Sequence, residues 1–237
     1  MIYVGIDDTD TKNTPGTNQL ARSLIRSLHP DYENVVAVRH QLLVDPRVPY
    51  TSKNSSASML FKAPGNGTPD ELAARLRQMM TDRFVPGSDP GLCLTEHVPE
   101  AVVRFGQRSK KEITSQSEAR QLAADHNIHL EGLGGTENGV IGALAAVGLV
   151  AYGNDGRVVN IGHWPDNLSG AQDVASLRDR GVAEIRCLES GTLIESGTVD
   201  VGKHLRPNYR NGRIVLFVTR VAGDVVGAAV WRAVRFS

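Results

Sequence analysis

Three aspartates stand close together near the start of the chain: Asp7, Asp8 and Asp10. They directly follow the apolar residues 2–6, whose composition predicts a buried strand. Carboxylates this close repel one another, so a nearby cation favours their ionised forms. Because Mg²⁺ takes one or two carboxylates and leaves room for phosphate oxygens, we predict that this acidic loop binds the metal and the phosphates of a nucleotide. A solvated acidic turn that caps the next helix is the alternative.

A helix is predicted to begin at about Thr17, after a loop rich in Asp, Thr, Asn, Pro and Gly. Leu20, Leu24 and Leu28 repeat at helical spacing and give this helix one apolar face. The free N–H groups at the start of a helix can bind phosphate, so Asn18 is a candidate nucleotide contact. A plain N-cap formed by Thr17 or Asn18 is compatible with that role.

A polar loop over residues 45–57 could also contact a nucleotide. It combines two prolines with Arg47, Lys53, Asn54 and Ser55, which could orient a phosphate or a ribose. On its own, this composition is more typical of an ordinary polar loop.

A glycine-rich turn over residues 132–139 leads into a helix of small residues that is predicted to end near Val150. Gly139 and Gly142 could let the backbone approach a ligand closely, or could let the helix pack tightly against its neighbours. Both interpretations stay open. The chain contains no GxxxxGK[ST] phosphate loop and no convincing dinucleotide fingerprint.

Basic and histidine side chains give weaker signals. The run 104–111 could touch RNA phosphates, but a solvated face is favoured because Lys plus Arg and Asp plus Glu both number 26. That zero net charge argues against a protein whose whole surface binds nucleic acid. His129 and His163 belong to no HxH or HExxH cluster, so neither is assigned a catalytic role.

Composition and cysteine usage indicate a soluble cytoplasmic protein. The chain has 237 residues, of which 41% are hydrophobic and 22% charged. Its two cysteines, Cys93 and Cys187, are too few for a four-cysteine zinc site, and we expect them to be buried, reduced thiols. We expect no signal peptide and no membrane span. The sequence leaves the oligomeric state open.

Helices and strands alternate irregularly along the chain, which predicts an α+β fold with two mixed α/β lobes. Residues 34–44, 57–61 and 92–94 are predicted strands, and further strands are predicted over 157–161, 182–187, 192–200, 213–220 and 225–235. Helices are predicted after Thr68, over 98–106 and 114–126, and near 169–179. The charged residues 108–112 suggest a boundary between domains 1–112 and 113–237.

Several motifs resemble, in their order, the archaeal tRNA(Ile) 2-agmatinylcytidine synthetase (TiaS) family. They are residues 5–10 (GIDDTD), 45–50 (DPRVPY), 89–91 (DPG), 139–148 (GVIGALAAVG) and 149–152 (LVAY). The resemblance implies an ATP- and Mg²⁺-binding kinase-like domain over 1–112 and a ferredoxin-like domain over 113–237. With so few cysteines and no further length, the family's RNA-binding OB fold and zinc ribbon are expected to be absent.

In that family the kinase-like domain phosphorylates a cytidine carbonyl and agmatine then displaces the phosphate. The resemblance implies that Asp7, Asp8 and Asp10 are its catalytic metal and ATP aspartates, since phosphoryl transfer relies on positioning and charge neutralisation. The family carries two adjacent threonines at the first helix, where this chain has Thr17 and Asn18. Thr17 is therefore the remaining candidate for a catalytic hydroxyl.

The leading functional prediction is an ATP-dependent, Mg²⁺-using enzyme of the kinase or ligase type, which activates a carbonyl or hydroxyl group. Its acceptor is expected to be a small molecule or nucleotide, with an amine as a further candidate substrate. Intact tRNA is not favoured as a partner. The alternatives are a non-catalytic nucleotide-binding or regulatory module, and tRNA modification with RNA-binding modules on a separate chain.

Overall fold

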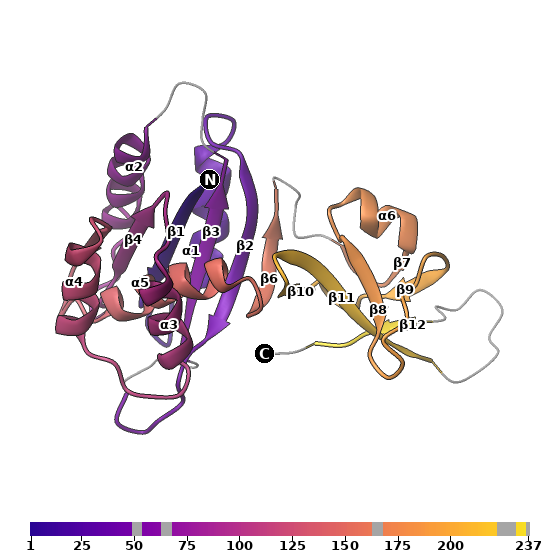
Figure 1. Cartoon of the computed structure of the whole chain (residues 1–237). Coiled ribbons are helices and arrows are strands. Elements are labelled where there is room, and N and C mark those ends of the chain that lie inside the picture. The colour runs from indigo at the N-terminus through magenta and orange to yellow at the C-terminus, as the bar shows by residue number, and fades with distance from the viewer. Residues whose placement is uncertain (49–53, 63–67, 163–167, 222–230, 236–237) are drawn as a thin grey trace.

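A mixed β-sheet runs through the whole molecule (Figure 1). The computed structural model describes residues 1–48, 54–62, 68–162, 168–221 and 231–235. Within these residues the strand order is β5-β4-β1-β3-β2-β6-β10-β11-β12-β9-β7, and β8 pairs with β11. The strands are β1 (Ile2–Asp7), β2 (Asn34–Gln41), β3 (Ser55–Phe61), β4 (Gly91–Thr95), β5 (His129–Gly132), β6 (Arg157–Ile161), β7 (Ala171–Asp173), β8 (Glu184–Cys187), β9 (Thr198–Asp200), β10 (Asn208–Arg210), β11 (Arg213–Arg220) and β12 (Trp231–Ala233).

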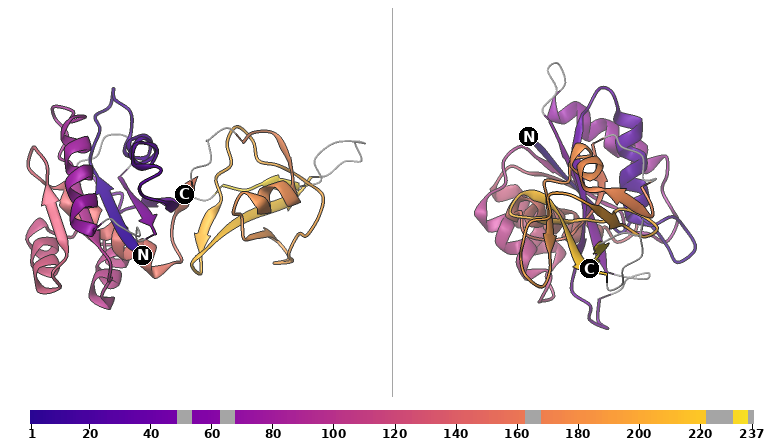
Figure 2. Two further views of the ribbon diagram at one scale, coloured as in Figure 1. Left: turned by 90° about the horizontal axis from the view of Figure 1, so that it is seen from above. Right: turned by 90° about the vertical axis from the view of Figure 1, so that its right-hand side faces the viewer.

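Two bodies share this sheet and meet where β6 pairs with β10 (Figure 2). The first lobe contains β1 to β6 and five helices, and the second lobe contains β7 to β12 and one short helix. The helices are α1 (Thr17–Leu28), α2 (Pro69–Thr81), α3 (Glu100–Arg108), α4 (Gln116–Asp125), α5 (Gly139–Tyr152) and α6 (Val174–Asp179). The chain is therefore a mixed α/β protein with a large mixed sheet.

Helices cover both faces of the first lobe's sheet. Strand β1 lies in the middle of that sheet and is therefore buried on both sides. Leu24 of α1 and Leu72 of α2 pack on one face, in a cluster with Ile6. On the other face, α3 and α5 form a second cluster that includes Phe105 and Leu144. Helix α5 is buried along most of its length, as expected for a helix that is apolar all round.

Most of the predicted elements form close to their expected positions. Helix α2 begins with the predicted capping box, in which Thr68 and Glu71 each bond the other's backbone N–H. Strand β2 ends at Gln41 rather than at residue 44. Strands β5, β7 and β10 were not predicted, and each has only three or four residues, too few for a clear alternating pattern.

Packing is continuous across the predicted domain boundary. Phe105 precedes residues 112 and 113, whereas Ala119 and Leu144 follow them, and all three lie in one hydrophobic cluster. The division into domains 1–112 and 113–237 stays a prediction. Cys93 and Cys187 are both free and buried. Among the helices described, none combines the length and the apolar character that crossing a bilayer requires.

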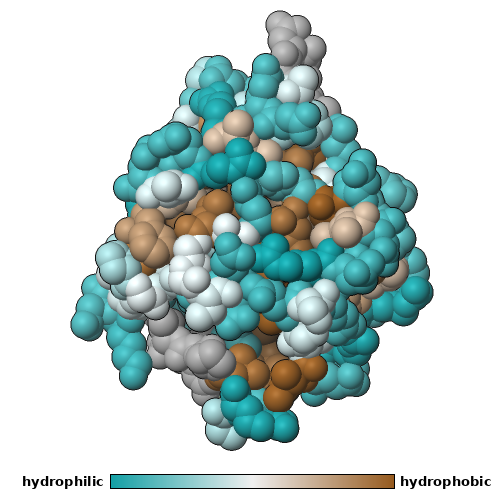
Figure 3. Space-filling model, turned by 90° about the vertical axis from the view of Figure 1, so that its left-hand side faces the viewer, coloured by the Kyte–Doolittle hydropathy of each residue, from teal (hydrophilic) through white to brown (hydrophobic). Residues whose placement is uncertain are grey.

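The side of the molecule that carries α2 and α4 has a mostly hydrophilic surface with separate hydrophobic patches (Figure 3). Exposed apolar side chains of the described residues include Val44, Phe84 and Ile113. Ile113 also lines the pocket described next.

Candidate functional site

A pocket lies where β1 ends and where the acidic loop meets the N-terminal ends of α1 and α5. Most of the residues that the sequence singles out in these segments line it: Asp7, Asp8, Asp10, Thr17, Asn54, Ser55, Gly139 and Gly142. Its remaining walls are Leu42, Leu43, Arg47, Val48, Ser109, Glu112, Ile113, Thr114, Asn138 and Ile141. The pocket therefore gathers four chain segments that are far apart in the sequence, over residues 7–17, 42–55, 109–114 and 138–142.

Asp10 and Thr17 join the acidic loop to the start of α1. The Thr17 backbone N–H donates to Asp10 Oδ1 at 3.1 Å, and the Thr17 hydroxyl donates to the same oxygen at 3.0 Å. Thr9 Oγ1 donates to Thr17 Oγ1 at 3.1 Å. Asp10 thus performs the task of an N-cap from seven residues upstream, because Gly16 at the N-cap has no side chain to do so.

Asp7 and Asp8 are carboxylates whose surroundings disfavour their charge. Burial, followed by the charges of Asp8 and Asp10, raises the pKa of Asp7 to about 7, although a hydrogen bond from the Asp8 backbone opposes this. Burial and the charge of Asp89 raise the pKa of Asp8 to about 6. Asp8 also has a φ of 49°, an uncommon conformation for a residue other than glycine. Perturbed carboxylates in a pocket are typical of functional sites.

The carboxylates suit a cation that is shared with another ligand. No group of three or more His, Cys, Asp or Glu side chains in the described residues forms a metal cage. Mg²⁺ needs no such cage, because it is commonly bound by one or two carboxylates together with waters and substrate phosphates. Asp7 and Asp8 can supply those carboxylates, and a cation would offset the burial and the repulsion that raise their pKa values.

The glycine-rich turn is attached to the acidic loop through Asp89. The backbone N–H and the hydroxyl of Thr136 donate to the Asp89 carboxylate at 2.7 and 2.6 Å. The Asp89 backbone N–H donates to the Asp8 carbonyl oxygen at 3.1 Å, and the Gly139 N–H donates to the Asp89 carbonyl oxygen at 3.0 Å. These bonds fix the N-terminal end of α5 beside the aspartates.

Gly139 and Gly142 allow tight packing, one of the two interpretations left open above. A Cβ atom on Gly142 would lie 1.7 Å from Asp7 Oδ2, and one on Gly139 would lie 2.2 Å from the Asp89 carbonyl oxygen. Both residues also line the pocket. The same contacts that pack α5 against β1 therefore place its first turn at the pocket wall. The N–H groups of Gly139, Val140 and Ile141 already donate to carbonyl oxygens there, so the turn would attract an anion mainly through the partial positive charge of the helix N-terminus.

The opposite wall comes partly from residues that the sequence did not single out. Ser109 and Glu112 lie in the charged segment 108–112 that suggested a domain boundary, and Thr114 follows it by two residues. The Leu43 N–H donates to the Ser109 carbonyl oxygen at 3.1 Å, which attaches this segment to the end of β2. Asn54 Nδ2 donates to the Leu43 carbonyl oxygen at 2.7 Å. The hydroxyl groups of Ser109 and Thr114 were the sequence feature that could have marked them as site residues. Only the fold, however, brings them close to the aspartates.

Two predicted nucleotide contacts, Asn18 and Lys53, are not found among the described residues that line the pocket. The half-buried Asn18 does not line the pocket, and its side-chain oxygen is buried without a hydrogen-bond partner. Lys53 lies outside the described residues, as does His163. His129 on β5 lies 2.8 Å from Glu131 Oε1, through its Nε2. The nucleotide contacts assigned to Asn18 and Lys53 stay predictions.

The basic run is largely satisfied within the chain. Arg104 pairs with Glu100, Arg108 with Glu118, and Lys110 with Asp155. These ion pairs are compatible with the solvated face that was favoured over an RNA contact. They also give the run a structural role, since Lys110 anchors the segment beside the pocket.

Asp155 belongs to a buried network that supports the pocket wall from behind. His40 Nδ1 lies 2.8 Å from Asp155 Oδ2, and His40 Nε2 lies 2.9 Å from Ser58 Oγ. Burial lowers the pKa of His40, although Asp155 opposes this shift. These three side chains have the atoms of a hydrolase triad, but Ser58 and His40 are 0% exposed, so no substrate can reach them. The network is structural.

Comparison with known proteins relates part of this chain to TiaS. It is 26% identical over 152 residues to the tRNA(Ile2) 2-agmatinylcytidine synthetase TiaS of Pyrococcus horikoshii, and 28% identical over 153 residues to that of Thermococcus sibiricus. Each match covers 62% of this chain and 35% of the relative. An uncharacterised protein of Methanocaldococcus jannaschii is 27% identical, with 64% of this chain and 50% of that protein covered. No protein-family model matches the chain.

Solved structures support the same relationship at the level of fold. A tRNA fluorescent labelling enzyme and the TiaS–tRNA(Ile2)–ATP complex each match with a TM-score of 0.54 and 24% identity. The TiaS–tRNA(Ile2)–AMPCPP–agmatine complex matches with a TM-score of 0.53 and 23% identity. Each match covers 62% of this chain, but only 35%, 36% and 35% of the respective structures. The resemblance found in the sequence is confirmed as a partial one, and the chain spans about a third of the TiaS proteins.

Proposed function

We propose that the pocket binds ATP with Mg²⁺ and directs phosphoryl transfer to, or activation of, a carbonyl or hydroxyl group. The observation that carries this proposal is that the acidic loop and the N-terminal turn of α5 lie side by side in the pocket wall. Asp7 offers carboxylate oxygens there, and Gly139 and Gly142 mark the helix start. Carboxylates for a cation and the partially positive N-terminus of a helix for phosphate are two features expected of a nucleotide site.

The chain's own groups have distinct roles in this proposal. Asp7 and Asp8 would hold the cation, whose positive charge would neutralise charge on the transferring phosphoryl group. Asp10 fixes the Thr17 hydroxyl toward the pocket through a 3.0 Å hydrogen bond and can accept its proton. Thr17 is only 6% exposed, so bulk water has little access to that hydroxyl.

The relatives support the use of ATP, and they add RNA to the small molecules that could accept the phosphoryl group. The names of the TiaS complexes include ATP, tRNA(Ile2) and agmatine, each of which is a ligand of that protein. The prediction that nucleic acid is not favoured as a partner gains no support from them. We propose a nucleotide as the acceptor, either free or within an RNA, and an amine as the second substrate.

Isothermal titration calorimetry of ATP with MgCl₂ tests the nucleotide site. The unmodified protein should bind ATP in the millimolar range or more tightly, and Asp8→Asn should weaken binding at least about tenfold because it removes one charge from the cation site. Asp31→Asn is the matched control, since Asp31 pairs with Arg75 on the surface. Absence of binding by the unmodified protein at millimolar ATP would contradict the proposal.

A non-catalytic nucleotide-binding module is the second candidate, and one observation favours it. The position next to Thr17 is Asn18, which has no hydroxyl to phosphorylate and does not line the pocket. Release of ADP distinguishes the two candidates when the protein is incubated with ATP, MgCl₂, agmatine and either cytidine or tRNA. Binding of ATP without ADP release in every mixture would favour the module, whereas release only with tRNA would identify an RNA acceptor.

A further inference from the structure

Two arginines lie directly opposite each other where the two lobes meet. Arg39 on β2 and Arg157 on β6 are cross-strand partners. Arg39 is only 5% exposed, and Arg157 is half-buried. Like charges placed opposite each other on neighbouring strands destabilise a sheet, and burial adds to that cost. Burial and the charge of Arg157 accordingly lower the pKa of Arg39.

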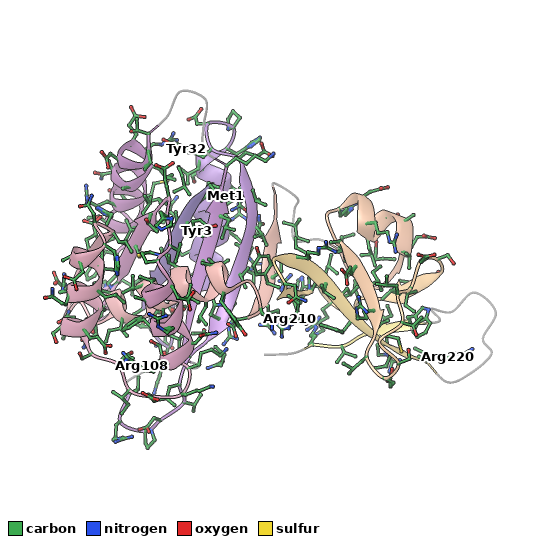
Figure 4. All side chains as sticks on the ribbon, in the orientation of Figure 1. Met1, Tyr3, Tyr32, Arg108, Arg210 and Arg220 are labelled. Carbon is green, nitrogen blue, oxygen red and sulfur yellow. The ribbon has the colours of Figure 1, made fainter. Side chains whose placement is uncertain are left out.

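Two arginines of the second lobe complete what we call the arginine cluster: Arg39, Arg157, Arg206 and Arg235. Burial lowers the pKa of Arg157, and the positive charges of Arg206 and Arg235 lower it further. Arg206 lies two residues before the start of β10, which pairs with β6, and Arg235 lies two residues after the end of β12. The Arg235 Nη2 atom donates to the His204 carbonyl oxygen at 3.1 Å, so its guanidinium is held over this junction. Arg210, at the same junction, is labelled in Figure 4.

Within the described part of the chain, Arg39, Arg157 and Arg235 are not neutralised by carboxylates. Among the described residues, no ion pair was found for Arg39, Arg157 or Arg235. Arg39 Nη2 donates instead to the neutral Gln41 Oε1 at 2.8 Å. The Nε atom of Arg157 is buried and has no hydrogen-bond partner. A buried donor without an acceptor normally costs about 1–3 kcal/mol, so its presence calls for an explanation.

Arginines elsewhere in the chain are treated differently. Arg75, Arg77 and Arg108 pair with carboxylates, although all three are more exposed than Arg39. These three arginines are therefore neutralised where water already screens them, whereas the more buried Arg39 has no ion pair within the described residues. This distribution is expected of a site whose neutralising group is a ligand.

We propose that the arginine cluster is a binding site for a phosphate group, independent of the ATP pocket. Guanidinium groups present planar pairs of N–H donors that match phosphate oxygens, and two or more of them can surround one phosphate. The phosphate can belong to the backbone of an RNA or to a small phosphorylated molecule. Both share the oxyanion chemistry that the cluster recognises.

The position of the arginine cluster relates it to the pocket. Cross-strand partners form a row from Ile6 through Ala57 and Arg39 to Arg157, across β1, β3, β2 and β6. Three strand spacings separate the ends of this row, or about 14 Å. Asp7 directly follows Ile6, so the cluster and the acidic loop lie at the same end of the sheet. A phosphate bound at the cluster could belong to a substrate whose reacting group reaches the pocket.

Fluorescence anisotropy with labelled oligouridine tests the site in the 237-residue chain. Arg157→Gln and Arg235→Gln should each weaken RNA binding about tenfold, and each should reduce the slope of log K against log salt by about 0.7. Arg232→Gln is the matched control, because Arg232 is exposed on β12, in the same lobe. Arg157→Lys keeps the charge but loses the planar fork, so it should weaken binding less than Arg157→Gln does.

A second arm identifies the source of the phosphate. Pyrophosphate should raise the melting temperature of the unmodified protein. If Arg157→Gln and Arg235→Gln lose this rise but bind RNA as the unmodified protein does, the site belongs to a small phosphorylated molecule. If both variants match Arg232→Gln in both assays, the proposal is wrong. Arg235 is exposed, so Arg235→Gln should fold normally and still tests the site if the half-buried Arg157→Gln variant misfolds. Binding of ATP with MgCl₂ to each variant is measured separately, so failure of the pocket proposal remains distinguishable.

Discussion

Asp155→Asn should destabilise the protein far more than its position in a surface turn between α5 and β6 suggests. The Asp155 carboxylate accepts from the ring of His40 at 2.8 Å and pairs with Lys110. Its side chain is 13% exposed, and that of His40 is 0% exposed. Burial raises the pKa of Asp155, but the hydrogen bonds and charges of His40 and Lys110 outweigh it and leave the pKa below its usual value.

Removing one partner of a buried pair typically costs 3–5 kcal/mol, because the other partner is left buried and uncompensated. Lys110 is 29% exposed and can turn toward water, so we expect about 3 kcal/mol for Asp155→Asn. Urea denaturation followed by circular dichroism measures this. Asp31→Asn is the control, because Asp31 and Arg75 form a surface pair that should contribute less than about 1 kcal/mol. Equal losses of about 1 kcal/mol or less in both variants would refute the role of the network.

Three further changes test other parts of the structure. Gly142→Ala would place a Cβ atom 1.7 Å from Asp7 Oδ2, so it should lower the free energy of unfolding by about 1–3 kcal/mol, measured by denaturation. It should also abolish ATP binding in calorimetry, and normal ATP binding would contradict the packing described. The stability that His40 contributes should fall as pH drops below about 6.5, because the pKa of buried His40 is lowered from 6.5 and the unfolded chain takes up the proton first. Asp7 and Asp8, whose raised pKa values act in the opposite direction, are present in both proteins, so the difference in stability between the unmodified protein and His40→Gln in denaturation series should shrink with falling pH. Thr17→Val keeps the shape but loses the hydroxyl bonded to Asp10, so ADP release should fall at least about tenfold while Thr17→Ser retains it.

Local patterns in the sequence predict the elements of the first lobe well. The apolar stripe of Leu20, Leu24 and Leu28 is long enough to identify α1, and the capping box at Thr68 fixes the start of α2. Both signals lie within one or two helical turns. Strand β10 has only three residues, and its place beside β6 depends on partners far away in the sequence, so no local pattern reveals it.

The candidate site divides in the same way. Asp7, Asp10 and Thr17 are close in sequence, and their grouping follows from a strand, a short loop and a helix start. Glu112 and Thr114 reach the same pocket from over 90 residues away, because α3 packs on α5. The register of β2 and β6 joins Arg39 to Arg157 across an even longer separation. Spacing along the chain carries no information about such cross-strand neighbours.

The distribution of charge in the fold changes what zero net charge implies. The equal totals of 26 basic and 26 acidic residues argue against nucleic-acid binding over the whole surface, but they do not describe any one region. The acidic loop and the arginine cluster lie at the same end of one sheet, about 14 Å apart by strand spacing. In each, burial and neighbouring like charges disfavour the charged form of at least one side chain, Asp7 in the loop and Arg157 in the cluster. If the chain needed only stability, pairing these groups with each other would serve it better. Their separation favours two binding sites, one for a cation with a nucleotide and one for a phosphate.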